Sequence, residues 1–437
     1  MLLDIKNKLG QRLQNTFGID IPYLYTGTKW NLVFQILASG STFLAGLAFA
    51  NWVNPEVYAQ YKYVFTVAAL LSSFAPLGLA MSVMKYTTQG ADNSLSFGFN
   101  KNIIWSIPFT LISLATAGYY FIHGNQTLGF GIGLIGISYP LINGLTFFAS
   151  FLNGQQKFRE SSLYAGSINA GVSVALILWL LLVKDTRFVD YPLLLIIVSL
   201  SATILLNAGA YVYIKKFVTK FQEFNAKEFV SYGLHQSALS FLGVVASQID
   251  KILVFQIIGG MPLAQYLFAI AIPEQIRSVF KGFSRLIFTR FEKRSLESIK
   301  KGMLKYILLA LGATIAVGAL YALAAPYIFS LFFKQYIDAV KFSQVFALSL
   351  CTIASILPQT ALQVKGYNKQ LYIFTVSSNT IQIGLNILCI SIWGLWGAVY
   401  SQLIGRTLSF FIVTILFYWS KAETFTDSPE LAEENSN

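Results

Sequence analysis

Twelve apolar stretches of about 20 residues or more follow one another between Trp30 and Trp419, separated by short polar segments. Roughly 20 mostly apolar residues are needed to cross a hydrocarbon core about 30 Å thick, and a helix satisfies its own backbone hydrogen bonds there. The sequence therefore predicts an all-α, polytopic membrane protein with twelve transmembrane helices. The predicted spans are 30–53, 61–83, 103–122, 129–152, 162–183, 191–214, 232–258, 264–286, 306–331, 343–364, 372–391 and 395–419.

The basic residues predict how these spans are oriented. With both termini in the cytoplasm, 24 of the 31 Lys and Arg residues lie in segments on that side, five lie outside and two lie within spans. The five outside residues are Lys62, Lys184, Arg187, Lys334 and Lys341. An excess of Lys and Arg in cytoplasmic loops is typical of membrane proteins. We therefore expect a multi-pass protein of the inner (cytoplasmic) membrane.

The net charge of +12 follows from this loop bias and does not indicate nucleic-acid binding, because no basic patch with interleaved aromatic residues lies on a soluble domain. With 55% hydrophobic and 11% charged residues, the chain has no room for a separate soluble domain, and we expect no enzyme activity. Cys351 and Cys389 have no metal-like spacing, so neither a metal nor a cofactor is expected. Gly131, Gly133 and Gly136 match a dinucleotide-binding pattern, but within a predicted span they indicate close helix packing.

The ends of the chain differ from its middle. Residues 1–29 carry apolar side chains at helical spacing opposite charged ones, which predicts a cytoplasmic amphipathic helix at the membrane surface. Residues 421–437 are acidic and poor in apolar side chains, which predicts a disordered cytoplasmic tail. Between them we expect a six-helix bundle over 30–214, a cytoplasmic linker over 215–230 and a second six-helix bundle over 231–420.

A faint internal repeat supports this division. Ala-Gln-Tyr ends at Tyr61 after the first span and at Tyr266 after the seventh, and Gly154 and Gly366 follow the fourth and tenth spans. Because six spans bring the chain back to the same side, the two bundles should be parallel and related by an axis along the membrane normal. Transporters built in this way usually hold their substrate between the bundles. Prolines within spans, at positions 76, 108, 140, 273 and 358, are candidate kinks.

Charged residues within predicted spans are the candidate site. Asp250 and Lys251 lie deep in the seventh span, and Glu274 and Arg277 lie at a comparable depth in the eighth. Such charges normally face a cavity or a partner. The spacing allows an Asp250–Arg277 or a Lys251–Glu274 contact, and two interpretations remain open: a cavity-lining role, or an ion pair that only orients two helices.

Three cations extend this pattern. Arg277, Lys281 and Arg285 recur every four residues and so share one helix face, which would suit an anionic group such as a diphosphate. The alternative is that Lys281 and Arg285 extend towards cytoplasmic headgroups as their helix leaves the membrane. Arg406 lies near the middle of the twelfth span, where facing a cavity is favoured over facing lipid.

Several short motifs resemble those of the polysaccharide biosynthesis (O-antigen-type) flippases, which belong to the multidrug/oligosaccharidyl-lipid/polysaccharide superfamily. They are Asn54-Pro55-Glu56-Val57-Tyr58-Ala59-Gln60-Tyr61 with Leu77-Gly78-Leu79, the segment Gln248-Ile249-Asp250-Lys251-Ile252-Leu253-Val254, Leu263-Ala264-Gln265-Tyr266 and Trp396-Gly397-Ala398-Val399. The resemblance covers roughly residues 28–420. Ala59 departs from the family pattern, which commonly has Gly after Tyr.

The resemblance implies two six-helix bundles in a V shape that move an undecaprenyl-diphosphate-linked oligosaccharide to the outer leaflet by alternating access. It implies a coupling ion, H⁺ or Na⁺, contact with membrane lipids, and cooperation with polysaccharide polymerase or assembly proteins. On this basis Lys251, Arg277, Lys281 and Arg406 are predicted to bind substrate, and Asp250 and Glu274 to serve in coupling or charge balance. The alternative is an ion-coupled multidrug exporter of the same superfamily. Such exporters tend to carry acidic residues in the first bundle, where this chain has almost none.

Overall fold

The structure, a computed structural model, describes residues 21–282, 287–288, 291–292 and 294–420. Side chains are described from Phe34 onward, except for Gln35 and for Lys281 and Gly282 at the end of one helix. The predicted surface helix before residue 21, the predicted acidic tail and the side chains of Lys281 and Arg285 lie outside the described residues. Within these ranges the chain is helical and has no strand.

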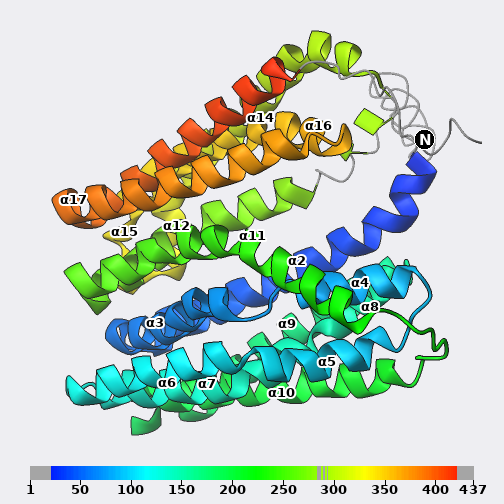
Figure 1. Ribbon diagram of the computed structural model, residues 1–437. Helices are drawn as coiled ribbons and strands as arrows, with labels where there is room; N and C mark the ends of the chain where they lie inside the picture. The colour runs from blue at the N-terminus through cyan, green and yellow to red at the C-terminus, as the bar shows by residue number, and fades with distance from the viewer. Residues whose placement is uncertain (1–20, 283–286, 289–290, 293, 421–437) are drawn as a thin grey trace, which may run out of the picture.

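Two groups of helices follow the chain order (Figure 1). The first, here called the N-bundle, comprises α2 (Ile21–Trp52), α3 (Pro55–Leu71), α4 (Leu79–Thr88), α5 (Ser94–Trp105), α6 (Ile107–Ile122), α7 (Gln126–Leu145), α8 (Phe147–Gly154), α9 (Phe158–Val183) and α10 (Pro192–Lys215). The second, the C-bundle, comprises α11 (Ala226–Leu253), α12 (Gly260–Gly282), α14 (Leu296–Phe332), α15 (Ala339–Ala347), α16 (Ile356–Val364) and α17 (Asn368–Trp419). Five short helices cap or join them: η1 (Ser72–Phe74), η2 (Arg187–Asp190), η3 (Val254–Ile258), η4 (Lys334–Tyr336) and η5 (Leu348–Ser355).

Helix α11 contacts both bundles. Near its start, the Ser82 hydroxyl of α4 donates to the Phe229 carbonyl (2.8 Å), and Ser237 accepts from the backbone N–H of Gly78 (2.8 Å). A Cβ at Gly78 would lie 2.2 Å from the Gly233 carbonyl oxygen, so only glycine permits this approach. Further along, α11 packs on α17. The helix therefore joins the two bundles through its opposite ends, as it runs between them in Figure 1.

Prolines and glycines explain the breaks in the helices. The second predicted span is bent by 61° between the α3–η1 segment and α4, where Pro76 interrupts the backbone ladder. Pro108 lies in the first turn of α6, directly after the break at Ser106. In α17, Gly394 has φ 56° and ψ −129°, and the two halves of the helix fold back on each other. Gly397 completes this turn, because a Cβ there would lie 1.9 Å from the Cys389 carbonyl oxygen.

Eight helices among the described residues are long and apolar enough to cross a membrane, and nine if the bent α3–α4 pair is one span. The folded-back α17 is counted once although it contains two predicted spans, 372–391 and 395–419. Helix α12 is not among the eight, and the described apolar part of α2 covers only Ile36–Trp52. The protein is an all-α, multi-pass membrane protein, while the exact number of twelve spans stays a prediction.

Two turns at equivalent places support the predicted repeat. After α8, the N–H of Lys157 donates to the Leu152 carbonyl (2.8 Å), and after α16 the N–H of Tyr367 donates to the Leu362 carbonyl (3.0 Å). Both turns contain a residue of positive φ, Gln156 at 59° and Gly366 at 72°. The turn geometry thus aligns Gly366 with Gln156 rather than with Gly154, the residue that the sequence pattern matched.

Close packing explains two of the three glycines of the rejected dinucleotide pattern. They lie on α7, where a Cβ at Gly131 would be 2.9 Å from Ile196 and one at Gly136 would be 2.6 Å from Ser113. A Cβ at Gly133 would be 3.6 Å from Ala117, an ordinary contact, so the packing prediction is confirmed for Gly131 and Gly136 alone.

Candidate substrate cavities

A cavity of about 430 Å³ lies between the two bundles. Its walls come from α2, α3 and α9 on one side and from α11 and α12 on the other. Polar groups enter it from both sides, namely Thr42, Lys62, Thr66, Ser173, Gln248, Lys251 and Gln275. Aromatic rings make much of the remaining wall, and no Asp or Glu among the described residues lines it. We call it the central cavity.

Lys62 lies in the central cavity, within a helix. Counting it with the outside loops is therefore wrong, whereas its place in the predicted span 61–83 is right. Helix α3 begins at Pro55, with the Asn54 side chain capping it by accepting from the N–H of Glu56, so Lys62 is two turns inside the helix. Its ammonium lies 5.6 and 5.5 Å from the ring centroids of Tyr58 and Tyr61, within the range of a cation–π contact. The Asn-Pro pair is a recognisable helix start and would have identified this position.

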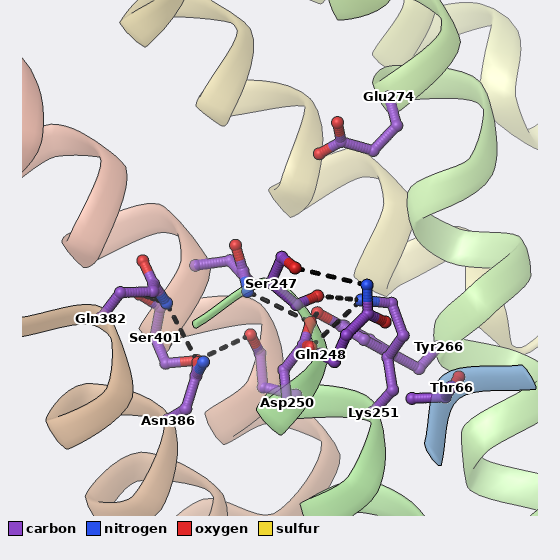
Figure 2. A network of polar contacts seen from close by, with 12 residues as sticks. Thr66, Ser247, Gln248, Asp250, Lys251, Tyr266, Glu274, Gln382, Asn386 and Ser401 are labelled. Atoms are coloured by element: carbon purple, nitrogen blue, oxygen red, sulfur yellow. Dashed lines mark hydrogen bonds and ion pairs between the residues drawn. The ribbon is translucent and has the colours of Figure 1, made fainter. Parts of the chain in front are cut away.

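Lys251 reaches the central cavity while Asp250 beside it is buried. The Lys251 ammonium lies 3.2 Å from Asp250 Oδ1 and donates to the Ser247 carbonyl (2.6 Å). The Asp250 side chain is 3% exposed, against 19% for Lys251. Figure 2 shows the pair on α11, with Thr66 of α3 on the opposite wall of the cavity.

Neutral donors complete the surroundings of Asp250. The Oδ2 atom of Asp250 accepts hydrogen bonds from the Tyr266 hydroxyl of α12 (2.7 Å) and from Gln402 Nε2 of α17 (3.1 Å). Next to Gln402, the Ser401 hydroxyl donates to Asn386 Oδ1 (2.7 Å) on the other half of α17. This buried network, seen in Figure 2, connects α11, α12 and both halves of α17.

A second cavity, of about 510 Å³, lies within the C-bundle. Arg277 and Arg406 are its cations, and its other polar lining is neutral: Ser355, Gln359, Thr360, Gln363, Thr375, Ser378, Asn379 and Ser409. The Ser378 hydroxyl is buried and without a hydrogen-bond partner among the described residues. No Asp or Glu of the described chain lines this cavity. We call it the C-bundle cavity.

The two arginines are held differently. Arg406 Nη2 pairs with Glu274 Oε1 (2.5 Å), Nη1 donates to the Ser349 hydroxyl (3.3 Å), and the guanidinium lies 4.9 Å from the Phe346 ring centroid. Arg277 Nη1 donates to the Thr352 hydroxyl (3.3 Å). Arg406 is therefore anchored by a carboxylate, whereas Arg277 has a neutral hydroxyl as its anchor.

These pairs differ from both contacts that the sequence spacing allowed. Asp250 meets its neighbour Lys251 rather than Arg277, and Glu274 meets Arg406 rather than Lys251. The reason is the rotation of α12. Gln275 lines the central cavity and Arg277 the C-bundle cavity, because residues two apart on a helix are rotated by about 200°.

The bundles also meet near the end that the charge pattern predicts to be outside. Gln256 Nε2 of η3 (Val254–Ile258) donates to the Tyr63 and Tyr120 hydroxyls (2.5 and 2.6 Å), which bond to each other (2.6 Å). The Tyr63 ring stacks on Phe255 with centroids 3.8 Å apart. Asn51 Nδ2 donates to the Phe332 carbonyl (3.1 Å). These contacts join the bundles beyond the central cavity.

Solved structures of transporters share this architecture. An inward-closed lipid II flippase MurJ matches with a TM-score of 0.68 and 16% identity, over 89% of this chain and 86% of its own. An inward-facing multidrug resistance transporter of the MATE family matches with a TM-score of 0.66 and 17% identity, over 91% of this chain and 100% of its own. A MOP-superfamily transporter from Pyrococcus furiosus, described as having reversed polarity of its binding pocket, matches with a TM-score of 0.56 and 14% identity, over 90% and 94%.

At these identities the structural likeness establishes the fold. Among curated proteins, the comparison finds no match. The sequence model described as "Polysaccharide biosynthesis protein" matches residues 24–289, more than half of the chain. The family and the structural relatives are transporters or flippases rather than enzymes. The chain therefore belongs to the polysaccharide biosynthesis protein family.

Proposed function

We propose that the protein is a flippase that moves an undecaprenyl-diphosphate-linked oligosaccharide from the cytoplasmic to the outer leaflet by alternating access. The observation that carries the proposal is the charge of the two cavities. Lys62 and Lys251 line the central cavity and Arg277 and Arg406 the C-bundle cavity, with no carboxylate of the described chain in either lining. Such sites attract an anion and repel a cation, and Arg binds phosphate oxygens in a bidentate manner.

The rest of the lining suits the other parts of such a substrate. Amide and hydroxyl side chains can exchange hydrogen bonds with sugar hydroxyls, and the aromatic wall of the central cavity offers apolar faces beside them. Lys281, whose side chain is not described, lies one turn beyond Arg277 on α12 and would add a further cation if it shares the same face. Four cations line the two cavities, and two of them are paired with a carboxylate: Lys251 with Asp250 and Arg406 with Glu274. Either carboxylate would serve as the site of H⁺ or Na⁺ coupling.

A multidrug exporter is the alternative within the same fold. A carboxylate in the cavity would favour a cationic drug by charge complementarity, and neither described lining supplies one. A strain depleted of its own polysaccharide flippases separates the two functions. We expect the chain to restore surface polysaccharide while leaving the minimal inhibitory concentrations of cationic drugs unchanged. Drug resistance without restored polysaccharide would contradict the proposal.

Direction of transport depends on orientation, which we propose from the basic residues: both termini in the cytoplasm of a cell with an inner membrane. Reporter domains fused after Lys184, between α9 and α10, and after Lys227, at the start of α11, should report opposite sides of the membrane. Reporter activity on the periplasmic side for the first and the cytoplasmic side for the second is expected. Matching signals from the two fusions would overturn the topology.

A further inference from the structure

A groove of about 440 Å³ on the surface between α5 and α11 is separate from both cavities. We call it the lateral groove and define it by Lys101 and Trp105 of α5 with Lys227, Val230, Ser231 and Leu234 of α11. We propose that the lateral groove binds the headgroup of an anionic phospholipid, with one acyl chain lying along its apolar end. The argument uses the charge, the depth and the apolar surroundings of the groove.

The charge of the groove favours an anion. Lys101 and Lys227 approach it from different helices, Ser231 adds a hydroxyl donor, and no carboxylate of the described chain lines it. Glu228, next in sequence to Lys227, is turned to α4, where it pairs with Lys85 at 3.1 Å. Lys101 contacts the Phe97 ring, 5.3 Å from its centroid. A phosphate between the two ammonium groups would supply the negative charge that the groove lacks.

The depth of the groove corresponds to the headgroup region of a bilayer. Lys227 lies in the first turn of α11, and Lys101 lies about 10 Å along α5 from Ser94, at a rise of about 1.5 Å per residue. Both helices begin at the end predicted to be cytoplasmic, where anionic lipids attract juxtamembrane lysines. A lysine at this depth extends its ammonium towards the headgroups while its stem stays among apolar groups.

The deeper part of the groove is apolar and adjoins a lipid-facing surface. Trp105, Val230 and Leu234 form this part. Trp105 is 42% exposed, and Ile103, Ile104 and Ile107 around it are 39%, 54% and 53% exposed. Tryptophan is enriched where headgroups meet acyl chains. Since basic headgroup-binding and apolar chain-binding parts are continuous, a lipid fits the groove better than a soluble phosphate compound does.

Native mass spectrometry of the purified full-length protein tests the proposal, with phosphatidylglycerol and phosphatidylcholine of identical acyl chains as probes. We expect one phosphatidylglycerol to be retained at least about 10-fold more tightly than phosphatidylcholine. In Lys101→Gln/Lys227→Gln this preference should disappear. The matched control is Lys215→Gln/Lys216→Gln, which removes two exposed lysines at the end of α10 that do not line the groove.

The other outcomes overturn the proposal. Equal retention of both lipids by the unaltered protein would mean that the groove does not select a charge, and equal losses in the two double variants would mean diffuse attraction by surface lysines. Ser231→Trp provides a second variant that keeps both lysines and fills the groove. It should displace the bound phosphatidylglycerol, and retention there would place the lipid elsewhere. Inorganic phosphate at millimolar concentration should not compete, and full competition would indicate a free-phosphate site.

Discussion

The variant Asp250→Ala is expected to lose about 3–5 kcal/mol of folding free energy, the usual cost of removing one partner from a buried ion pair. Asp250 accepts from Lys251, Tyr266 and Gln402 in the middle of the C-bundle. Alanine would leave the Lys251 ammonium without its counter-charge and the Tyr266 hydroxyl and Gln402 amide without their acceptor. Because α11, α12 and α17 all meet at this carboxylate, the loss should lower both the yield of monodisperse protein in detergent and its midpoint of thermal unfolding.

Two further variants distinguish the charge from the hydrogen bonds. Asp250→Asn keeps an acceptor for Tyr266 and Gln402 and should cost less than alanine. Asp250→Ala/Lys251→Met removes both charges and should recover part of the stability, since no uncompensated ammonium remains. If Asp250→Ala unfolds at the same temperature as the unaltered protein, the network does not hold the C-bundle together. In that case Asp250 would be free to serve coupling alone.

The helices and their order could be predicted from the sequence because the bilayer imposes them. An apolar run of about 20 residues satisfies its own backbone hydrogen bonds in lipid as a helix. Among the residues that the structure describes, the predicted spans therefore fall on helices, apart from breaks such as the one at Pro76. Pro76 and Pro108 were candidate kinks, and both lie at observed breaks. The turn at Gly394 lies between the predicted eleventh and twelfth spans, where the apolar pattern is interrupted by glycine and tryptophan.

The distribution of charges between cavities could not be predicted in the same way. It depends on how each helix is rotated about its axis and on which distant helix lies opposite. Glu274 meets Arg406 through the packing of α12 against α17, and no local pattern contains that contact. The loop assignment of Lys62 is wrong for a different reason. Lys62 lies near a span boundary, and Asn54 and Pro55 indicate that the helix starts earlier than the apolar pattern does.

Arg277 offers the sharpest test of the anion site, because of the two arginines that line the C-bundle cavity it is the one held by a hydroxyl rather than by a carboxylate. A hydrogen bond to a charged group contributes about 1.5–3 kcal/mol, and 1.4 kcal/mol corresponds to a tenfold change in affinity. If Arg277 contacts the diphosphate, Arg277→Gln should therefore weaken transport by about 10–100-fold at low substrate concentration. Expression and thermal unfolding should remain close to those of the unaltered protein.

Arg406 should behave differently because it forms an ion pair with Glu274, which its removal would break. Arg406→Gln is expected to lose folded protein as well as transport, and Arg406→Gln/Glu274→Gln should regain folding because both charges are removed together. Transport by this double variant then reports substrate contact alone.

If Arg277→Gln and the double variant both fold and both export polysaccharide at the unaltered rate, the C-bundle cations only orient helices. The diphosphate would then have to bind at Lys62 and Lys251 in the central cavity, where Lys62→Gln becomes the decisive variant.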